Sequence, residues 1–151
     1  LEHMETVSCN YSAEVLFKYL SFAETDKSGS WVESSKVLVE VLTNFLGYDP
    51  ELSIHDGSGL SRSNFLKTSV LSDLLMKIHK NYGDAFIRHL PVPGKGTLRN
   101  RLINWESEKI HAKTGSLTGV AALSGYIYSR DIAFSIIINN YLGTDKMSSI
   151  I

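Results

Sequence analysis

The sequence predicts an α+β domain in which helices precede a three-strand antiparallel meander. In the first half of the chain, apolar residues repeat at helical spacing in three segments. From about Lys109 the pattern changes to three short apolar runs separated by turn residues. Because helices and strands do not alternate, a parallel α/β sheet is not expected. The 151 residues are enough for one domain with a substantial core.

Three helices are predicted, over residues 12–24, 31–45 and 67–79. Gly47 suits the C-terminal cap of the second helix, and Pro50 prevents its continuation. Spacing of three and four residues places the apolar side chains of each segment on one side of its helix. These side chains are Val15, Leu16, Tyr19 and Leu20 in the first, Val37, Leu38, Val41, Leu42 and Phe45 in the second, and Leu71, Leu74, Leu75 and Ile78 in the third.

The remaining segments of the first two thirds are loops with little regular structure. Residues 51–64 begin as a short strand and become a Gly/Ser loop. Residues 83–91 form a short helix or turn that Pro91 ends, and residues 92–102 form a loop that enters a short helix. Residues 1–4, "LEHM", read as a cloning remnant, so the domain is taken as residues 5–151.

The three strands are predicted at residues 109–117, 119–129 and 131–142. Turns at Thr118–Gly119 and at residues 129–131 separate them, and the last two are hairpin partners. No long closing helix is expected in "LGTDKMSSII", residues 142–151. A three-stranded sheet covered on one face leaves its other apolar face open, so we expect the chain to be part of a larger fold.

Composition excludes several classes of function. A net charge of −1 gives no overall basic field for nucleic acid, and the cations of residues 94–102 are interpreted as a solvated face. The single cysteine, Cys9, excludes an internal disulfide and a cysteine-rich zinc site. The histidines lack metal-ligand spacing, so neither a metal nor a cofactor is expected. No apolar run approaches the ~20 residues of a membrane span.

Lys113-Thr114-Gly115, at the edge of the first predicted strand, is the stretch best suited to meet an anion. A lysine on a strand supplies a fixed positive charge, threonine adds a hydroxyl donor to a carboxylate, and glycine lets a substrate backbone lie close. The alternative is an ordinary exposed lysine before a strand. Ser58 does not complete a Gly-x-Ser-x-Gly elbow, and Gly94–Gly96 does not complete a phosphate-binding loop.

Four stretches occur in a fixed order along nearly the whole chain. They are "SCNYSAE" (residues 8–14), "DGSGLSRSN" (residues 56–64), "GTLRNR" (residues 96–101) and "AKTGSLTGVAALSGY" (residues 112–126). Together they resemble the D-alanyl-D-alanine carboxypeptidase/endopeptidase family, the class C low-molecular-mass penicillin-binding proteins of peptidase family S13. The resemblance implies part of a transpeptidase-like fold shared with β-lactamases. This chain would supply part of its helical half and three strands of a five-stranded sheet.

One element of the family pattern is absent, because no serine here is followed three positions later by lysine. In the family this Ser-x-x-Lys nucleophile motif lies upstream of the Ser-x-Asn stretch. The resemblance therefore implies a C-terminal fragment that begins at the second motif. The nucleophile and the remaining strands would belong to a missing N-terminal part. We expect the isolated chain not to form an acyl-enzyme.

The resemblance implies a role for each site residue. Ser8 would relay a proton towards the leaving amine, or else cap a helix N-terminus. Asn10 would hydrogen-bond the substrate amide and hold the two lysines of the site, or else form a local turn. Lys113 and Thr114 would bind the terminal carboxylate of a stem peptide or β-lactam. Gly115 gives room, and the N–H of Ser116 would complete the oxyanion hole.

Residues around these motifs have more open roles. Arg62 would meet a carboxylate on the third residue of the stem peptide, or form a structural salt bridge. Asp56 is expected to fix its own loop through local backbone bonds. Arg99 and Arg101 are interpreted as structural. Cys9 stands where the family commonly has aspartate, and is either a modifiable thiol near the cleft or a small, partly buried side chain.

The function implied for the parent protein is that of a serine-type carboxypeptidase of the bacterial periplasm or extracytoplasmic cell envelope. It would cleave D-Ala-D-Ala in peptidoglycan through an acyl-enzyme. One alternative is a non-catalytic module that binds peptidoglycan or a partner. A β-lactamase is the other, but "DGSGLSR" and "GTLRNR" resemble the carboxypeptidase family. An open sheet edge also predicts self-association.

Overall fold

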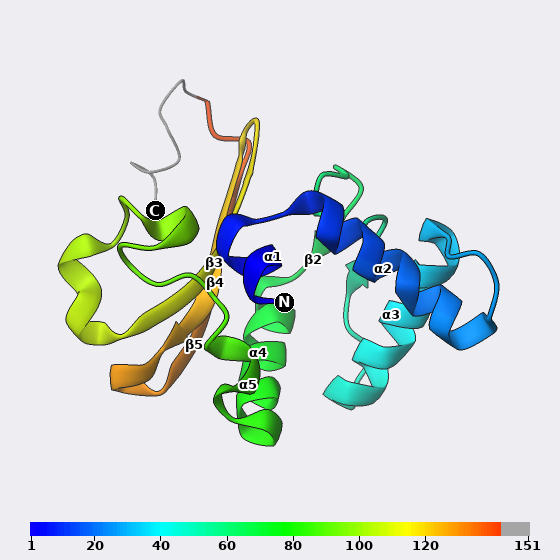
Figure 1. Ribbon diagram of the computed structural model, residues 1–151, viewed down its shortest axis with the longest axis horizontal. Helices are drawn as coiled ribbons and strands as arrows, with labels where there is room; N and C mark the ends of the chain where they lie inside the picture. Colours follow the sequence, from blue (N-terminus) through cyan, green and yellow to red (C-terminus); the bar gives the residue numbers. More distant parts are fainter. Residues whose placement is uncertain (143–151) are drawn as a thin grey trace. The chain divides into compact units, whose positions relative to one another are not determined.

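The computed structural model describes residues 1–142 and divides the chain into two compact units (Figure 1). One unit holds Cys9–Val70. The other holds Leu1–Ser8 together with the chain from Leu71 onward. The expectation that no closing helix follows the last strand concerns residues that lie outside the described part. Within residues 1–142, no helix is long and apolar enough to cross a membrane.

The unit of Cys9–Val70 is built on two long helices and a short hairpin. The helices are α2 (Asn10–Thr25) and α3 (Trp31–Leu46), and both were predicted. The hairpin pairs β1 (Leu52–Ser53) with β2 (Phe65–Leu66). The sequence did not predict β2, because a two-residue strand has no periodicity to recognise. Its partner across the ladder fixes it instead.

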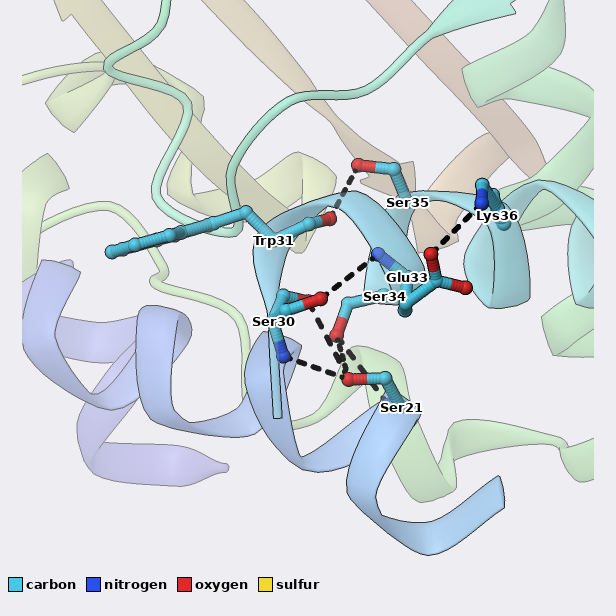
Figure 2. A network of polar contacts seen from close by, with 7 residues as sticks. All are labelled: Ser21, Ser30, Trp31, Glu33, Ser34, Ser35 and Lys36. Carbon is cyan, nitrogen blue, oxygen red and sulfur yellow. Dashed lines mark hydrogen bonds and ion pairs between the residues drawn. The ribbon is translucent and has the colours of Figure 1, made fainter. Parts of the chain in front are cut away.

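Three serines join α2 to α3, as Figure 2 shows. Ser30 caps α3, and its side chain accepts a hydrogen bond from the Glu33 N–H at 3.2 Å. The fully buried hydroxyl of Ser34 donates to Ser21 Oγ at 2.9 Å, and the Ser30 N–H donates to the same oxygen at 3.0 Å. Small side chains let the two helices approach closely while each buried hydroxyl keeps a partner.

The apolar face predicted for the first helix is largely exposed in the described residues. Val15, Leu16 and Tyr19 are about half exposed, whereas Phe17 and Ser21 are buried. The helical period was therefore correct, but it did not identify the side that packs within this unit. The exposed positions form a continuous apolar stripe on α2.

The other unit contains a three-stranded sheet flanked by short helices. Its helices are α1 (Glu2–Val7), the greater part of α4 (Thr68–Tyr82), α5 (Asp84–Ile87), and the 3₁₀ helices η1 (Gly96–Leu98), η2 (Ile103–Glu108) and η3 (Tyr128–Arg130). The sequence did not predict α1, because its first residues were set aside as a remnant. The helix predicted from residue 67 is confirmed as α4 and extends three residues further.

The sheet confirms the predicted antiparallel meander. Its strands are β3 (Ile110–Leu117), β4 (Val120–Ile127) and β5 (Ile132–Asn139), in that spatial order. Successive side chains of a strand point to opposite faces. One face packs Ala112 and Leu123 against Leu98 of η1, and the other packs Tyr126 against Ile87 of α5. Figure 1 shows the sheet between α5 and the yellow-green segment that carries η1 and η2.

Candidate active site

Ser8 and Lys113 are 105 residues apart in sequence and in direct contact in the structure. Ser8 ends α1 in a left-handed conformation, with φ 58° and ψ 54°, and its N–H donates to the Met4 carbonyl. Lys113 lies in the middle of β3. Its ammonium donates to Ser8 Oγ at 2.6 Å and to the Thr114 carbonyl at 3.0 Å. A cation and a hydroxyl are thereby placed side by side on rigid elements.

Ser8 does not cap a helix N-terminus, which was its alternative role. Cys9 occupies the N-cap of α2, and no side chain caps that helix end. Ser8 is instead the C-cap of α1, where its backbone closes the last turn and its hydroxyl is left for Lys113. The left-handed backbone is uncommon for a residue other than glycine and is frequent at functional sites.

The electrostatics at Lys113 involve a residue that the sequence did not indicate. Burial lowers the pKa of the Lys113 ammonium, and the carboxylate of Glu5 opposes this shift. Burial also raises the pKa of Glu5, against the attraction of Lys113. Glu5 lies one turn before Ser8 on α1, so the same short helix supplies both neighbours of the lysine. Glu5 was missed because α1 was not predicted.

The "GTLRNR" stretch packs against α1. Gly96, the first residue of η1, has φ +53°, and the Thr6 carbonyl oxygen occupies the space that a Cβ atom would need. Only glycine allows this approach of two backbones. Thr6 is two residues before Ser8, so Gly96 helps to fix the element that carries the hydroxyl. Arg101 is buried, in agreement with a structural role, whereas Arg99 is exposed.

The outer edge of β3 presents backbone hydrogen-bonding groups beside Lys113. Because β3 is at the edge of the described sheet, only one side of it pairs with β4. The Ala112 N–H points away from β4 and donates to the Pro91 carbonyl at 2.8 Å. Antiparallel pairing alternates with a period of two, so the N–H groups of Thr114 and Ser116 also point outward. Ser116 is an exposed residue on this outer edge.

Thr114 and Gly115 have different surroundings from Lys113. The Thr114 side chain lies on the same face as Ala112 and is only 9% exposed, while its carbonyl accepts from Lys113. Gly115 pairs with Ala122, and a Cβ atom on Gly115 would lie 3.3 Å from the Ala122 Cβ. An alanine there would be tight against Ala122, on the face of the strand opposite Thr114, before any ligand arrives.

Asn10, Cys9 and Arg62 belong to the unit of Cys9–Val70. Asn10 is the exposed first residue of α2. Cys9 is partly buried and accepts a hydrogen bond from the Ser12 hydroxyl at 3.2 Å, which lowers the pKa of the thiol. Arg62 is exposed on the loop between β1 and β2. Ser8, Lys113, Thr114, Gly115 and Ser116 all lie in the other unit.

The loop that carries Arg62 is held by two carboxylates. Asp56 accepts from the Gly59 and Ser61 N–H groups at 2.9 and 2.6 Å, which confirms the predicted local bonding. Glu14 on α2 accepts from the Ser58 N–H at 2.9 Å and from Trp31 Nε1 at 2.8 Å. The "SAE" and "DGSGLSRSN" stretches therefore meet through Glu14, a contact that sequence spacing could not reveal.

Comparison with known proteins agrees with these motifs. A family model described as the D-Ala-D-Ala carboxypeptidase 3 (S13) family matches residues 1–151. A D-alanyl-D-alanine carboxypeptidase from Actinomadura sp. is 37% identical over 147 residues, which cover 90% of this chain and 27% of that protein. A penicillin-sensitive carboxypeptidase A from Dictyostelium discoideum is 44% identical over 98 residues, covering 56% of this chain and 19% of that one.

A solved structure gives the same result in three dimensions. Penicillin binding protein 4 (dacB) from Haemophilus influenzae, crystallised with a β-lactam, superposes with a TM-score of 0.85 and 31% sequence identity. The match covers 95% of this chain and 35% of that one. The chain thus spans between 19% and 35% of the length of these proteins.

Proposed function

Because the chain belongs to the D-Ala-D-Ala carboxypeptidase 3 (S13) family, we propose that it forms half of the active site of a serine-type carboxypeptidase/endopeptidase. The enzyme would act on peptidoglycan stem peptides through an acyl-enzyme and bind β-lactams at the same place. The contact between Lys113 and Ser8, beside the open edge of β3, carries this proposal. The chain contains no Ser-x-x-Lys, so another part of the enzyme supplies the nucleophile, and the chain alone is inactive.

The edge of β3 binds the substrate in this proposal. An extended peptide adds alongside the strand, and its terminal carboxylate pairs with the Lys113 ammonium. The outward N–H of Ser116 donates to the carbonyl oxygen as negative charge develops on it during acyl transfer. Thr114 binds the same carboxylate from the neighbouring position. Gly115 keeps the strand surface flat where the substrate backbone passes.

Ser8 moves the proton. Attack on the carbonyl between the two D-alanines expels an amine, which must be protonated as the bond breaks. The Ser8 hydroxyl accepts a hydrogen bond from Lys113 and keeps its own hydrogen available for donation. Ser8 passes that proton to the leaving amine and takes up another from the side of Lys113. Asn10 holds the substrate amide, and Arg62 meets a second carboxylate on the stem peptide.

The proposed setting follows from the substrate. Peptidoglycan places the enzyme in the bacterial periplasm or elsewhere in the extracytoplasmic cell envelope. Its partners are the stem peptide, or a β-lactam in its place, and the part of the enzyme that carries Ser-x-x-Lys. Neither nucleic acid nor a cofactor enters the proposed reaction.

Covalent labelling with a fluorescent penicillin, read by intact mass, tests the proposal. The 151-residue chain and the full-length product of its gene are compared under the same conditions. Labelling of the full-length product alone supports a divided active site. Labelling of this chain would mean that one of its own serines, Ser8 or Ser58, is nucleophilic. Labelling of neither would favour the alternative, a non-catalytic module that binds peptidoglycan or a partner protein.

A further inference from the structure

A groove of about 690 Å³ lies within the unit that contains the sheet, at the beginning of β3. Its walls come from three places in the sequence: α5 with the loop that follows it, the first residues of β3, and η3. The lining residues used below are Arg88, Val92, Pro93, Lys109, Ile110 and Tyr128. None of Ser8, Lys113 and Ser116 lines it. The volume is within the usual range for sites of small organic ligands.

The charges in this groove leave a positive surplus. Asp84 also lines it, but its carboxylate already accepts from the Tyr128 hydroxyl at 2.8 Å and lies 3.7 Å from His79 Nδ1. The neighbouring carboxylate of Glu108 is bound to Arg130 at 2.9 Å and to the Ser129 hydroxyl at 2.6 Å. Both acids thus have hydrogen-bonding partners of their own, and the formal charges of Asp84, Arg88 and Lys109 in the groove add to +1.

The two cations of the groove have no such partner among the described residues. Arg88 and Lys109 are exposed and take part in no ion pair or side-chain hydrogen bond there. Paired surface cations and carboxylates are commonplace, whereas two unpaired cations that line one concave site favour an anion between them. The guanidinium of Arg88 is suited to a planar, two-oxygen acceptor.

The backbone at Lys109 is fixed even though its side chain is free. Lys109 has φ 51°, a left-handed conformation that costs free energy for a residue other than glycine. Its carbonyl accepts from the Tyr128 N–H at 3.3 Å, which ties the start of β3 to η3. The ammonium group is thus presented from a determined point at the rim of the groove.

The remaining walls are apolar. Val92 and Pro93 form one part, and the ring of Tyr128 packs edge-on against the His111 imidazole at 5.1 Å. Ile110 also lines the groove, but it is only 5% exposed and packs into the core with Leu98. His111 Nδ1 is 3.2 Å from the Ile87 carbonyl, so that nitrogen carries the hydrogen, and Nε2 of the neutral ring can only accept a hydrogen bond. Such a lining binds an aliphatic body and leaves a charged group at the cationic rim.

We propose that this groove binds a small carboxylate ligand with an aliphatic chain, with Arg88 and Lys109 pairing its anionic group and Val92 and Pro93 covering its apolar part. The site is separate from the one at Lys113, and its occupation does not depend on the function proposed above. His111 and Lys113 are two residues apart on β3, so about 7 Å of strand separates the two sites. A ligand in the groove therefore contacts the strand that carries Lys113 without occupying its position.

Titration of the isotopically labelled chain with N-acetylglutamate, followed residue by residue by NMR, tests the proposal. We expect saturable shifts of the backbone amides of Ile110, His111 and Ser129. The neutral probe N-acetylglutaminamide should bind at least tenfold more weakly, because it lacks the carboxylates. A titration with inorganic phosphate distinguishes a site for a carboxylate with an aliphatic chain from a site for any anion. Saturation by phosphate at a lower concentration than by N-acetylglutamate would overturn the carboxylate assignment.

Variants locate the binding. Combining Arg88→Gln with Lys109→Gln should weaken N-acetylglutamate binding at least tenfold, whereas Lys95→Gln combined with Arg99→Gln, two exposed cations outside the groove, should leave it unchanged. Lys113→Gln should also leave the shifts at Ile110 and His111 in place. Absence of saturable shifts in the unsubstituted chain would refute the site. So would shifts that disappear with Lys113→Gln and persist in the Arg88→Gln, Lys109→Gln chain.

Discussion

The Thr6 carbonyl oxygen occupies the space that a Cβ atom on Gly96 would need. This backbone contact joins η1 to α1, and α1 ends at Ser8, which Lys113 contacts from β3. The glycine of the "GTLRNR" stretch thus acts on the candidate site through an intervening helix. It is a positioning residue, because it touches neither the hydroxyl nor the ammonium.

Gly96→Ala should destabilise the chain and displace α1. A side chain at φ +53° costs about 1–2 kcal/mol, and the collision with Thr6 adds about 1–3 kcal/mol. Gly59→Ala is the control for the backbone cost, since Gly59 has φ +78° with nothing within 4 Å of the added carbon. Urea unfolding of both variants gives the difference due to the collision. Equal losses of stability would show that the contact with Thr6 has no energetic consequence.

Glu14→Ala should release the loop between β1 and β2. Although burial raises the pKa of Glu14, hydrogen bonds from Ser58 and Trp31 lower it below its usual value. Removing these charge-assisted bonds should cost about 1–3 kcal/mol and speed hydrogen exchange at the Ser58 amide. A carboxylate with a lowered folded pKa stabilises at neutral pH, and that stabilisation is lost in acid. The difference from the unsubstituted chain should therefore shrink below about pH 4.

The matched control for that experiment is Glu24→Ala, on the same helix. Glu24 is exposed, and its side chain makes no hydrogen bond or ion pair among the described residues. We expect a change within about 0.5 kcal/mol and no faster exchange at Ser58. If the two variants behaved alike, helix propensity rather than the contacts of Glu14 would explain the loss.

The sequence predicted the fold well where a periodic pattern met a clear boundary. The alternating run from Ile110 gave the meander, and Gly47 marked the end of the second helix, which α3 confirms. Prediction failed where stability comes from partners distant in sequence. β2 exists because β1 pairs with it, and α1 exists in part because η1 packs against it. Neither has a periodic pattern of its own that a single sequence could display.

The candidate site likewise contains some residues that the sequence indicated and others that it did not. Lys113 was selected from its place in Lys-Thr-Gly at a strand edge, whereas Ser8 and its link to Lys113 came from the resemblance, because no spacing rule links residues 105 positions apart. Glu5 was missed, since a carboxylate on a short helix resembles any exposed acid until the fold buries it. The buried side of Thr114 was missed for a different reason. Alternation along β3 gives two faces, and only the packing of Leu98 shows which of them is the inside.

Lys113 should lose its proton at a lower pH than a lysine ordinarily does. Burial lowers the pKa of this ammonium, so the folded chain releases the proton before the unfolded chain does. Stability should therefore rise as the pH increases between the folded and unfolded pKa values of Lys113. NMR titration of lysine Cε resonances, assigned with Lys113→Arg, measures the shift. A Lys113 resonance that titrates at the pH usual for lysine, or above it, would contradict it.

Glu5→Gln should lower the pKa of Lys113 further. The Glu5 carboxylate stabilises the charged lysine, and its removal leaves burial unopposed. Glu2→Gln changes an exposed acid on the same helix and should have a much smaller effect. The same Cε titration gives both values. An upward shift with Glu5→Gln would mean that the carboxylate does not face the ammonium.

The chain should associate with itself through β5. Only β4 pairs with this strand in the described sheet, so a row of backbone N–H and C=O groups along its other edge lacks a strand partner. Ile132 and Ile136 are 45% and 42% exposed on it, and apolar edge strands add to one another. Sedimentation velocity at rising concentration should therefore show dimers or larger species.

Ile136→Lys should shift the distribution to monomer, because a charge on an edge strand opposes pairing. Val41→Lys, a similarly exposed position on α3, should not, and a monomer at every concentration would refute the association.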